Sequence, residues 1–308
     1  MKVAVIGATI VDVVSYVDKA PNYGGTVTVK DYHIACGGKG ANQAVAAKKL
    51  GADVLMLSTV GDDLFGKMAR ENLTQLGIDT RQVITVKNIK NGTVMIIVES
   101  SGQYRSMFYR GASYFLTPQD IYNAADDLKN CGLFVIQLEI PHETVYAAIE
   151  FANKNNISVL LNPSPLHEKL SIEKAVPCEF FILNETELEI LTEINTDSLE
   201  NISIAAKKLL AYGVKNIIVT LGNQGSIWFT EGVSEFVPTL KVDSVDSTGA
   251  GDAFAGCFAK NYADGKTILE SIQLASKYAA LSVTRKGTQD SYLTAEEFET
   301  FLSAGEIL

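Results

Sequence analysis

A run of small residues followed by a carboxylate lies near the end of the chain, directly before a helical segment. It reads Asp246-Ser247-Thr248-Gly249-Ala250-Gly251-Asp252. Free N–H groups at the start of a helix, together with the helix dipole, form a binding site for an anion such as a phosphate. Asp252 stands where it could accept a proton from a hydroxyl that attacks this phosphate. The alternative is a helix cap that follows a Gly-rich turn.

A second glycine-rich run opens a helix near the amino end. It reads Gly37-Gly38-Lys39-Gly40-Ala41-Asn42-Gln43. Paired glycines let the backbone come close to a polar ligand, and Lys39 and Asn42 supply donors suited to hydroxyl oxygens. The run lacks the GxxxxGK[ST] pattern of a Walker A loop and is not a convincing GxGxxG fingerprint. It predicts a site for a sugar-like ligand, with a helix-capping turn as the alternative.

Two further polar runs each follow a strand-like segment. Asn184-Glu185-Thr186-Glu187 comes after residues 181–183, and Thr220-Leu221-Gly222-Asn223-Gln224-Gly225 comes after residues 217–219. Open α/β sheets bind ligands at the carboxyl ends of their strands. The first run could hold Mg²⁺ through water, and the second could contact a nucleotide phosphate. The alternatives are a helix start with acidic residues that favour the dipole, and a tight turn.

Short apolar runs alternate with amphipathic segments along most of the chain. Strands buried on both faces are predicted at residues 54–57, 133–136, 159–161, 180–183 and 217–220. Helical periodicity marks residues 42–50, 64–76, 118–128, 142–155 and 203–211. This alternation predicts an α/β fold, a doubly wound and mainly parallel sheet flanked by helices. We expect a single domain over residues 1–308.

Two segments depart from that alternation and predict a small separate β-sheet. Residues 13–34 and 92–109 contain the half-exposed alternating runs 26–29 and 93–98, and Ser100-Ser101-Gly102 supplies a turn within the second segment. A sheet with one apolar face and no helices must cover something. We expect a β-sheet lid that covers the ligand site and also contacts a second subunit.

Composition limits the classes of partner. The formal charge of −10 gives a surface that repels nucleic acid and anionic membranes. The four cysteines form no CxxC pair, and no apolar run approaches the roughly 18 residues of a membrane span. His33, His142 and His167 are the only histidines, so a zinc or His-based catalytic site has few candidates. We expect a reduced, cytoplasmic protein with small-molecule ligands.

In this order, the four runs resemble the ribokinase-like (PfkB) family of carbohydrate kinases. Gly37 to Gln43 is similar to the N-terminal signature of the family, and Asp246 to Asp252 to its C-terminal signature. Runs at 162–165, 184–187 and 283–289 extend the likeness over nearly the whole chain. The resemblance implies an ATP-dependent kinase that phosphorylates the 5-hydroxyl of a free pentose. It also implies Mg²⁺, a monovalent cation such as K⁺, and a homodimer formed through the lid.

The resemblance further implies a role for each matching residue. Asp252 would be the general base, with Gly249, Ala250 and Gly251 as the anion hole. Sugar contacts would come from Asp12, Gly38, Lys39, Asn42 and Glu139. Nucleotide contacts would come from Asn184, Thr220, Gly222, Gly225, Gly251 and Ser276, with Glu187 near Mg²⁺. The monovalent cation would be bound, partly through backbone carbonyls, by Asp246, Thr248, Ser282, Arg285, Gly287 and Ser291.

One position departs from the pattern of family members that act on ribose. These carry Asn two residues before the sugar-binding Asp, whereas this chain has Ile10 before Asp12. A ribose hydroxyl that faced Ile10 would lack a partner, at a cost of about 1 to 3 kcal/mol. An apolar residue here, and the run at 185–192, resemble the branch that phosphorylates 2-deoxy-D-ribose. We therefore expect 2-deoxyribose first and ribose next; the alternative is a packing change without effect on specificity.

Other functional classes fit less well. A sugar-binding regulator without catalysis would lack the base or the anion hole, and both are present here. A dinucleotide-dependent oxidoreductase needs a Gly-rich fingerprint directly after the first strand, and residues 7–12 lack those glycines. Nucleoside and hexose-phosphate kinases remain as alternatives within the family. A phosphorylated sugar would need extra basic residues near the lid. Between residues 82 and 284 the only arginines are Arg105 and Arg110.

Overall fold

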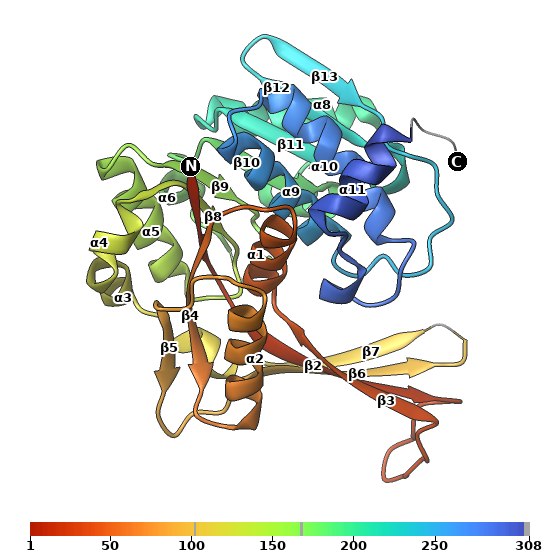
Figure 1. Cartoon of the computed structure of the whole chain (residues 1–308). Helices are drawn as coiled ribbons and strands as arrows, with labels where there is room; N and C mark the ends of the chain where they lie inside the picture. Colours follow the sequence, from red (N-terminus) through yellow and green to blue (C-terminus); the bar gives the residue numbers. More distant parts are fainter. Residues whose placement is uncertain (102, 167–168, 305–308) are drawn as a thin grey trace.

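The computed structural model describes residues 1–101, 103–166 and 169–304, and within them thirteen strands form two sheets (Figure 1). The larger one, the main sheet, has the order β13-β12-β11-β10-β9-β8-β1-β4-β5. Pairing is parallel from β11 to β5, and β12 and β13 add antiparallel pairs at one edge. The strands are β1 (Lys2–Ile6), β4 (Val54–Gly61), β5 (Val83–Val86), β8 (Cys131–Ile136), β9 (Ser158–Leu161), β10 (Phe180–Asn184), β11 (Asn216–Thr220), β12 (Ser226–Thr230) and β13 (Val233–Val237).

Helices cover both faces of the main sheet, as the sequence predicts. One face carries α1 (Lys39–Lys49), α2 (Leu64–Gln75), α9 (Ala250–Ala263), α10 (Ile268–Ser282) and α11 (Ala295–Ser303). The other carries α3 (Pro118–Asn123), α4 (Ala125–Leu128), α5 (His142–Lys154), α6 (Ile172–Ala175), α7 (Glu185–Thr192) and α8 (Leu199–Ala211). Short 3₁₀ turns are η1 (Gly111–Phe115), η2 (Gly222–Gln224) and η3 (Gln289–Ser291).

The hydrophobic core consists of two apolar layers separated by the main sheet. Successive side chains of a strand point to opposite faces, so Val3 and Val5 of β1 join the layer beneath α1 and α9. Ala4 and Ile6 join the layer beneath α5 and α8. Full burial of one Val or Ile side chain contributes about 1.5 to 3 kcal/mol. The central strands are therefore apolar on both faces and give the site a rigid floor.

Two helix predictions differ from the structure. The segment predicted as one helix over 118–128 is divided at Ala124, which ends α3 and begins α4 with φ −87° and ψ 7°. The helix predicted from Ser203 begins at Leu199 instead. Its start is set by Ser198, whose hydroxyl accepts a hydrogen bond from the amide of Asn201 at 3.2 Å.

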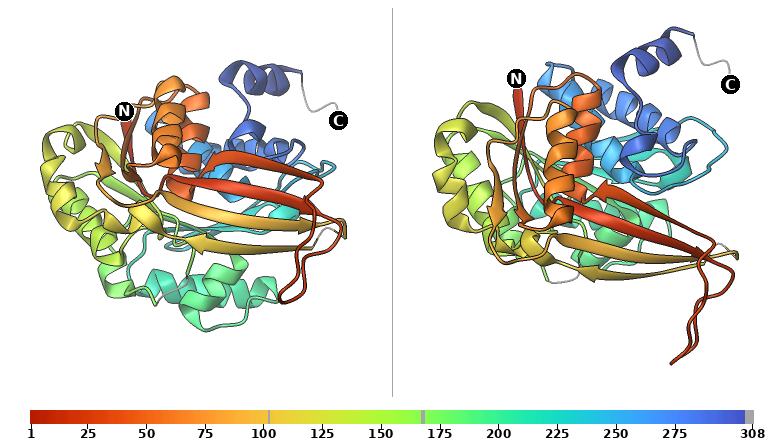
Figure 2. Two further views of the ribbon diagram at one scale, coloured as in Figure 1. Left: turned by 90° about the horizontal axis from the view of Figure 1, so that it is seen from below. Right: turned by 60° about the horizontal axis from the view of Figure 1, so that its bottom comes forward.

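The smaller sheet, the lid, projects from the main body (Figures 1 and 2). Its order is β3-β2-β6-β7, with β2 and β6 parallel and the outer pairs antiparallel. The strands are β2 (Ile10–Val17), β3 (Asp31–Gly37), β6 (Gly92–Glu99) and β7 (Tyr104–Tyr109). Such a sheet was predicted, but β2 begins at Ile10 rather than Val13, so Asp12 belongs to the lid.

The run Thr26 to Val29, whose alternation predicted a strand, is not one. Pairing of β2 with β3 ends at Tyr16 opposite Asp31, which leaves residues 26–29 without a partner strand. Of the turn predicted at residues 100–102, Gly102 lies outside the described residues, as does His167. The four cysteines are free thiols, and none of the described helices has both the length and the apolar character that a membrane crossing requires.

Candidate active site

The strand order reverses beside β1, which lies between β4 and β8. The helix α1, which follows β1 after the lid strands β2 and β3, and the helix α5, which follows β8, cover opposite faces of the sheet. A crevice forms at such a point outside the carboxyl ends of the strands, and open α/β sheets bind ligands there. The chain places residues 7–10 after β1 and residues 137–139 after β8 at this carboxyl edge.

The amino-terminal turns of α1 and α9 meet at the carboxyl edge because the two helices pack unusually closely. A Cβ atom on Gly256 of α9 would lie 2.6 Å from the Cβ of Ala46 and from the carbonyl oxygen of Gln43. Only glycine fits at this contact. The close packing brings Asn42 and Gln43 within reach of Asp252.

The Asp252 side chain is held from two sides and is only 5% exposed. Its Oδ2 accepts a hydrogen bond from Asn42 Nδ2 at 3.0 Å, and its Oδ1 accepts one from Gln43 Nε2 at 2.9 Å. Both donors are neutral amides that can fix a carboxylate without neutralising it. The geometry suits a general base whose position is set before the substrate arrives.

Lys39, Glu139 and Asp12 complete a cluster of charges around this carboxylate. The backbone N–H of Lys39 donates to Glu139 Oε2 at 2.7 Å. Asp12 reaches the site because position 37 is glycine: a Cβ there would lie 2.4 Å from Asp12 Oδ2. The structure therefore brings together Asp12, Lys39, Asn42, Glu139 and Asp252, five residues predicted from sequence.

Burial and mutual repulsion perturb the charges of this cluster. Burial raises the pKa of Glu139 to about 7, against the opposing attraction of Lys39. Burial and the nearby Asp252 raise the pKa of Asp12 to about 6. Burial lowers the pKa of Lys39, but Asp252, Glu139 and Glu187 together raise it above its usual value. Negative charge dominates, which favours a neutral ligand that donates several hydrogen bonds.

Position 10 is apolar and tightly enclosed. Ile10 is 3% exposed and shares its face of β2 with Asp12, two residues along the strand. A Cβ on the adjacent Gly92 would lie 2.6 Å from Ile10 Cγ2 and 3.1 Å from Ser113 Oγ. The buried Ser113 hydroxyl has no hydrogen-bond partner among the described residues. Ile10 is thus an apolar neighbour of the Asp12 carboxylate on this face of β2.

A pocket of about 600 Å³ lies on the other side of the α9 terminus. This is the size of a site for a small molecule such as a nucleotide. Its lining includes the predicted nucleotide contacts Thr220, Gly222, Gly225, Gly251 and Ser276. Ser276 is 3% exposed, and its Oγ has no partner among the described residues. Lys241 and Val242 also line the pocket, and no motif in the sequence marked them.

Gly249 shapes the turn into α9. Its φ of 78° is left-handed, and a Cβ there would lie 2.3 Å from Thr288 Cγ2, so this residue must be glycine. The helix then starts at Ala250, and the amides of its first turn have no partners within the helix. A Cβ on Gly251 would meet nothing within 4 Å. The Ala250 N–H donates to the Ser247 carbonyl at 3.3 Å, whereas the turn at Gly251 leaves open space and an N–H group that the helix does not use, as an anion hole requires.

Asn184 and Glu187 form the helix cap that was the alternative to a magnesium site. Asn184 Oδ1 accepts from the amide of Glu187 at 2.9 Å, and Glu187 Oε2 accepts from the amide of Asn184 at 3.0 Å. The charge of Glu187 nevertheless contributes to the raised pKa of Lys39. Asn184 stands outside the lining given above, at the register position opposite Thr220.

The two segments assigned to a monovalent cation come together through Asp246. Its Oδ1 accepts from the amide of Thr248 and its Oδ2 from the amide of Gly287, both at 3.0 Å. Burial raises the pKa of Asp246, but these amides and Lys286 lower it more, so the carboxylate stays ionised. The Ser282 and Ser291 hydroxyls donate to nearby carbonyls, and the Arg285 guanidinium pairs with Glu297 at 3.0 Å. Because these side chains already have partners, a monovalent cation between the two segments would be held mainly by backbone oxygens.

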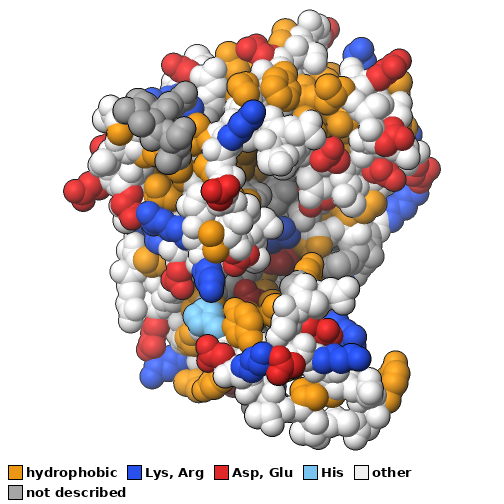
Figure 3. Space-filling view, turned by 90° about the vertical axis from the view of Figure 1, so that its right-hand side faces the viewer, with side chains coloured by type: hydrophobic (Ala, Val, Ile, Leu, Met, Phe, Trp, Pro, Cys, Tyr) orange, Lys and Arg blue, Asp and Glu red, His pale blue; other side chains and the backbone are white. Residues whose placement is uncertain are grey.

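Potential metal-ligating side chains are dispersed in the part of the chain that the structure describes. No cluster of three or more His, Cys, Asp or Glu side chains is arranged there to hold a metal ion. A divalent ion would therefore depend on ligand phosphates and water for most of its coordination. Figure 3 shows charged side chains of both signs recessed between the lid, below, and the main body, above.

Four amide side chains near Asp252 were not singled out as site residues by sequence reasoning. Gln43 also donates to Asn162 Oδ1 at 3.0 Å and accepts from Gln137 Nε2 at 2.6 Å. Gln289 donates to Asn42 Oδ1 at 3.0 Å. Gln137 and Asn162 directly follow buried strands, a position that could have marked them. Gln289 lies in a loop and carried no such signal.

Comparison with known proteins gives consistent relatives. A model of the pfkB family of carbohydrate kinases matches residues 1–295. The deoxyribokinase of Salmonella typhi is 46% identical over 306 residues, covering 99% of this chain and 100% of that protein. The ribokinase of Schizosaccharomyces pombe is 37% identical and covers 94% of each chain. The structure of the Arabidopsis thaliana ribokinase complexed with ribose and ATP matches with a TM-score of 0.93, at 29% identity over 98% of both chains.

Proposed function

The chain belongs to the pfkB family of carbohydrate kinases and is a phosphotransferase that acts on a hydroxyl group, and we propose that it transfers the γ-phosphate of ATP to the 5-hydroxyl of 2-deoxy-D-ribose. The observation that carries this proposal is the position of Asp252. It stands at the start of α9 between a cluster suited to hydroxyls and a pocket suited to a nucleotide. D-Ribose is the second candidate, since ribokinases are also among the relatives.

The sugar would lie between the lid and the α1 terminus. Asp12 and Glu139 can accept hydrogen bonds from sugar hydroxyls, while Lys39 and Asn42 can donate them. The lid supplies an apolar surface on the same face as Asp12, because Asp12 pairs with Val94, and Val94 with Phe108. Ile10 would lie against the carbon that lacks a hydroxyl in 2-deoxyribose and would leave a ribose hydroxyl without a partner.

In the proposed reaction Asp252 accepts the proton of the 5-hydroxyl as its oxygen attacks the γ-phosphorus. The bond from this phosphorus to the β,γ-bridging oxygen breaks, and ADP leaves. The first-turn amides of α9, from Gly249 to Gly251, donate to the transferring phosphoryl group and stabilise its charge. The fixed orientation of Asp252 means that little rearrangement is needed during transfer.

Two cations would support this chemistry. Mg²⁺ would be held by the ATP phosphates and by water near Glu187, and when bound it would supply positive charge that neutralises the transferred group. K⁺ would be held by Asp246, Thr248, Ser282, Arg285, Gly287 and Ser291. Asp246 accepts from the amide of Gly287, so a cation there would help to hold residues 246–248 against the loop whose Tyr292 contacts Gly249.

The outer face of the lid supports the proposal of a homodimer. Cross-strand pairing places Val13, Ile34, Met95 and Met107 in one row on the face opposite Asp12. Ile34, Met95 and Met107 are 36%, 42% and 57% exposed. An apolar row of this kind fits a second copy of the lid, and Met107→Glu should then lower the mass measured by light scattering to that of a monomer.

The experiment that tests the proposed function measures ADP release with Mg²⁺ and K⁺ and compares kcat/KM for 2-deoxy-D-ribose and D-ribose. We expect deoxyribose to be preferred. Ile10→Asn should shift the ratio toward ribose by about 5-fold or more, because the amide can pair with the extra hydroxyl. The unpartnered Ser113 hydroxyl beside Ile10 gives the new amide a second neighbour.

Ile204→Asn is the matched control, since it makes the same chemical change at an exposed position of α8, outside the lid. It should leave the substrate ratio unchanged. Equal use of both pentoses by the wild-type protein, with no shift in the Ile10 variant, would reduce Ile10 to a packing residue. Lack of turnover with either pentose would reject the proposal and direct the search to nucleosides and hexose phosphates.

A further inference from the structure

A chain of hydrogen-bonded amide side chains runs outward from Asp252. Asn42 donates to the carboxylate through Nδ2 at 3.0 Å and accepts from Gln289 Nε2 at 3.0 Å. Gln289 in turn accepts from Asn72 Nδ2 through Oε1 at 2.8 Å. Three amides from α1, η3 and α2 thus connect in series to one oxygen of the proposed base.

The direction of every bond in this series follows from the carboxylate. An ionised Asp252 can only accept, so Asn42 must turn its NH₂ group inward and its oxygen outward. Gln289 must then present its own NH₂ to Asn42 and its oxygen to Asn72, which donates. Reversal of any one amide would place two acceptors or two donors in contact.

The backbone around Gln289 is held by both helices that build the site. Lys49, in the last turn of α1, donates through Nζ to the carbonyls of Gln289 at 2.8 Å and Tyr292 at 2.9 Å. The Tyr292 hydroxyl donates to the carbonyl of Gly249 at 3.0 Å. Gln289 is 8% exposed. Its side chain is therefore fixed relative to Asn42 and to the anion hole at the same time.

We propose that Gln289 is a positioning residue for phosphoryl transfer: it locks the Asn42 amide with its NH₂ toward Asp252. The proposal rests on the function proposed above for Asp252. Without Gln289, the Asn42 amide can rotate, and its oxygen then repels the carboxylate and displaces it from the attacking hydroxyl. The second amide, Gln43, has its own anchor in Gln137 and cannot replace this contact.

Two substitutions of similar size test the role of the donor. Gln289→Met removes both hydrogen bonds, and we expect kcat to fall about 10-fold. Gln289→Glu keeps an acceptor for Asn72 but turns an acceptor toward Asn42, so it should favour the reversed amide and lower kcat further. The KM for ATP should stay within about twofold in both, because Gln289 does not line the nucleotide pocket. Thermal unfolding of each variant shows whether it is folded.

A double-mutant cycle with Asn42→Ala separates positioning from general stability. If Gln289 acts through Asn42, Gln289→Met should lower kcat by less than about twofold once Asn42 is absent. Gln137→Met is the matched control, because Gln137 donates to Gln43 and not to Asn42. It should lower kcat by the same factor with and without the Asn42→Ala substitution. Asn72→Leu, at the outer end of the series, should lower kcat by about 2- to 3-fold and serves if the Gln289 variants do not fold.

Equal losses of kcat from Gln289→Met with and without Asn42 would overturn the proposal, and so would Gln289 variants of unchanged kcat. Failure of the function proposed above looks different. In that case the wild-type protein would turn over neither pentose, or Asp252→Asn would retain wild-type turnover, whatever the Gln289 variants do.

Discussion

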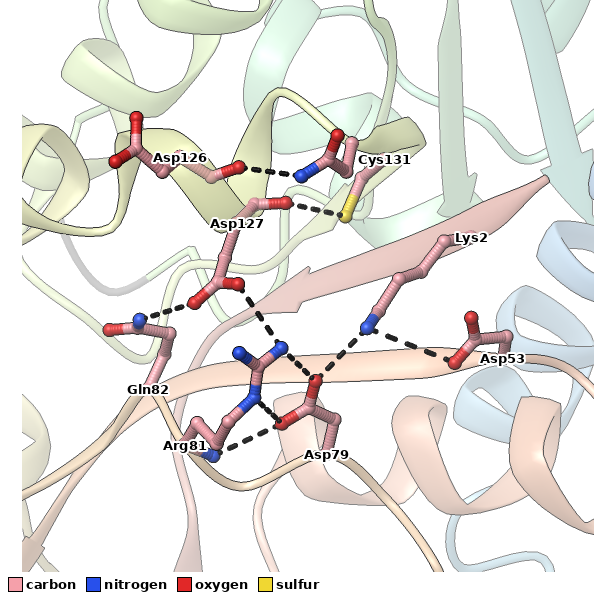
Figure 4. Close-up of polar contacts among 9 residues, drawn as sticks. Lys2, Asp53, Asp79, Arg81, Gln82, Asp126, Asp127 and Cys131 are labelled. Carbon is pink, nitrogen blue, oxygen red and sulfur yellow. Dashed lines mark hydrogen bonds and ion pairs between the residues drawn. The ribbon is translucent and has the colours of Figure 1, made fainter.

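At the amino ends of its strands the main sheet carries a cluster of charges that are paired with one another, whereas at the carboxyl ends Asp12, Glu139 and Asp252 gather around Lys39. Figure 4 shows the first, the amino-edge cluster of Lys2, Asp79, Arg81 and Asp127. The Arg81 guanidinium donates to both carboxylate oxygens of Asp79, at 3.0 and 2.8 Å, and also contacts Asp127 at 3.1 Å. Lys2 donates to Asp79 at 3.0 Å.

The two clusters shift carboxyl pKa values in opposite directions. At the amino edge, the hydrogen bonds from Arg81, and those from Lys2, hold the pKa of Asp79 well below its usual range. At the carboxyl edge, burial raises the pKa of Glu139 to about 7 and that of Asp12 to about 6. Ionised Asp79 therefore stabilises the fold, while ionised Glu139 and Asp12 destabilise it.

The difference indicates that a ligand binds at the carboxyl edge of the sheet rather than at the amino edge. Charges that satisfy one another have little left for a ligand, and those at the amino edge hold the starts of β1, β4 and β5 together. Charges that burial leaves poorly compensated are stabilised when a ligand donates to them. The stability lost at the carboxyl edge is thus part of the free energy available for substrate binding.

The largest effect is expected for Asp252→Asn, which removes the proposed base from the carboxyl edge. We expect kcat to fall by about 10² to 10⁴, with sugar binding largely intact. Asn can accept from only one of the two amides that now donate to Asp252, so a small loss of stability should accompany this. Asp264→Asn, at the other end of α9, is the control. Near-normal turnover in the Asp252 variant would mean that the charge cluster at the carboxyl edge does not serve catalysis through this residue.

A smaller effect is expected for Glu139→Gln, and it concerns stability against pH. With a pKa of about 7, folded Glu139 keeps its proton between about pH 4.5 and 7 while the unfolded chain releases it, so stability falls as the pH rises through this window. The stability of the Gln variant should not decrease in this way. At pH 8 its free energy of unfolding should be about 1 to 3 kcal/mol higher than that of the wild type, while its KM for the sugar rises.

Urea unfolding at pH 5 and pH 8 measures this difference for Glu139→Gln. The exposed Glu143, four residues along, is the control, and Glu143→Gln should leave the pH dependence as it is. A Glu139 variant less stable than wild type at pH 8 would show that the carboxylate is compensated in place, as at the amino edge.

The smallest effect is expected for Asp79→Asn at the amino edge. The low pKa of Asp79 provides stability above about pH 4 that is lost as the pH falls further. The variant should therefore be about 1 to 2 kcal/mol less stable at pH 7, with the difference shrinking below pH 4 and kcat unchanged. Asp53→Asn, whose carboxylate is exposed and 3.9 Å from Lys2, should change little. A loss of activity in Asp79→Asn would mean that the two edges are coupled.

Much of the fold could be predicted because its signals are local. The short, continuous apolar runs at 133–136 and 180–183 are buried strands, as such runs indicate. The two glycine-rich runs do open helices. The division at Ala124 and the unpaired run 26–29 could not be predicted in the same way. Whether an alternating run becomes a strand depends on a partner, and here β2 has already paired with β3.

The site was predictable only where a motif marks it. Lys39 and Asp252 stand in glycine-rich runs, whereas Gln289 reaches Asn42 from 247 positions away along the chain. Glu187 is a residue with two possible uses: its Oε2 accepts from the amide of Asn184 and caps α7, and its place near Mg²⁺ stays a prediction. Side chains with two uses, or with partners remote in sequence, require the three-dimensional arrangement before their role can be assigned.

The start of β2 at Ile10 makes the lid part of the binding equilibrium. Asp12 belongs to the lid, while Lys39, Glu139 and Asp252 belong to the main body. A ligand that contacts both binds only the fraction of molecules in which the two sheets are aligned, and its apparent Kd is the intrinsic value divided by that fraction. Any contact that steadies the lid, however far from the sugar, therefore tightens sugar binding without adding an interaction with it.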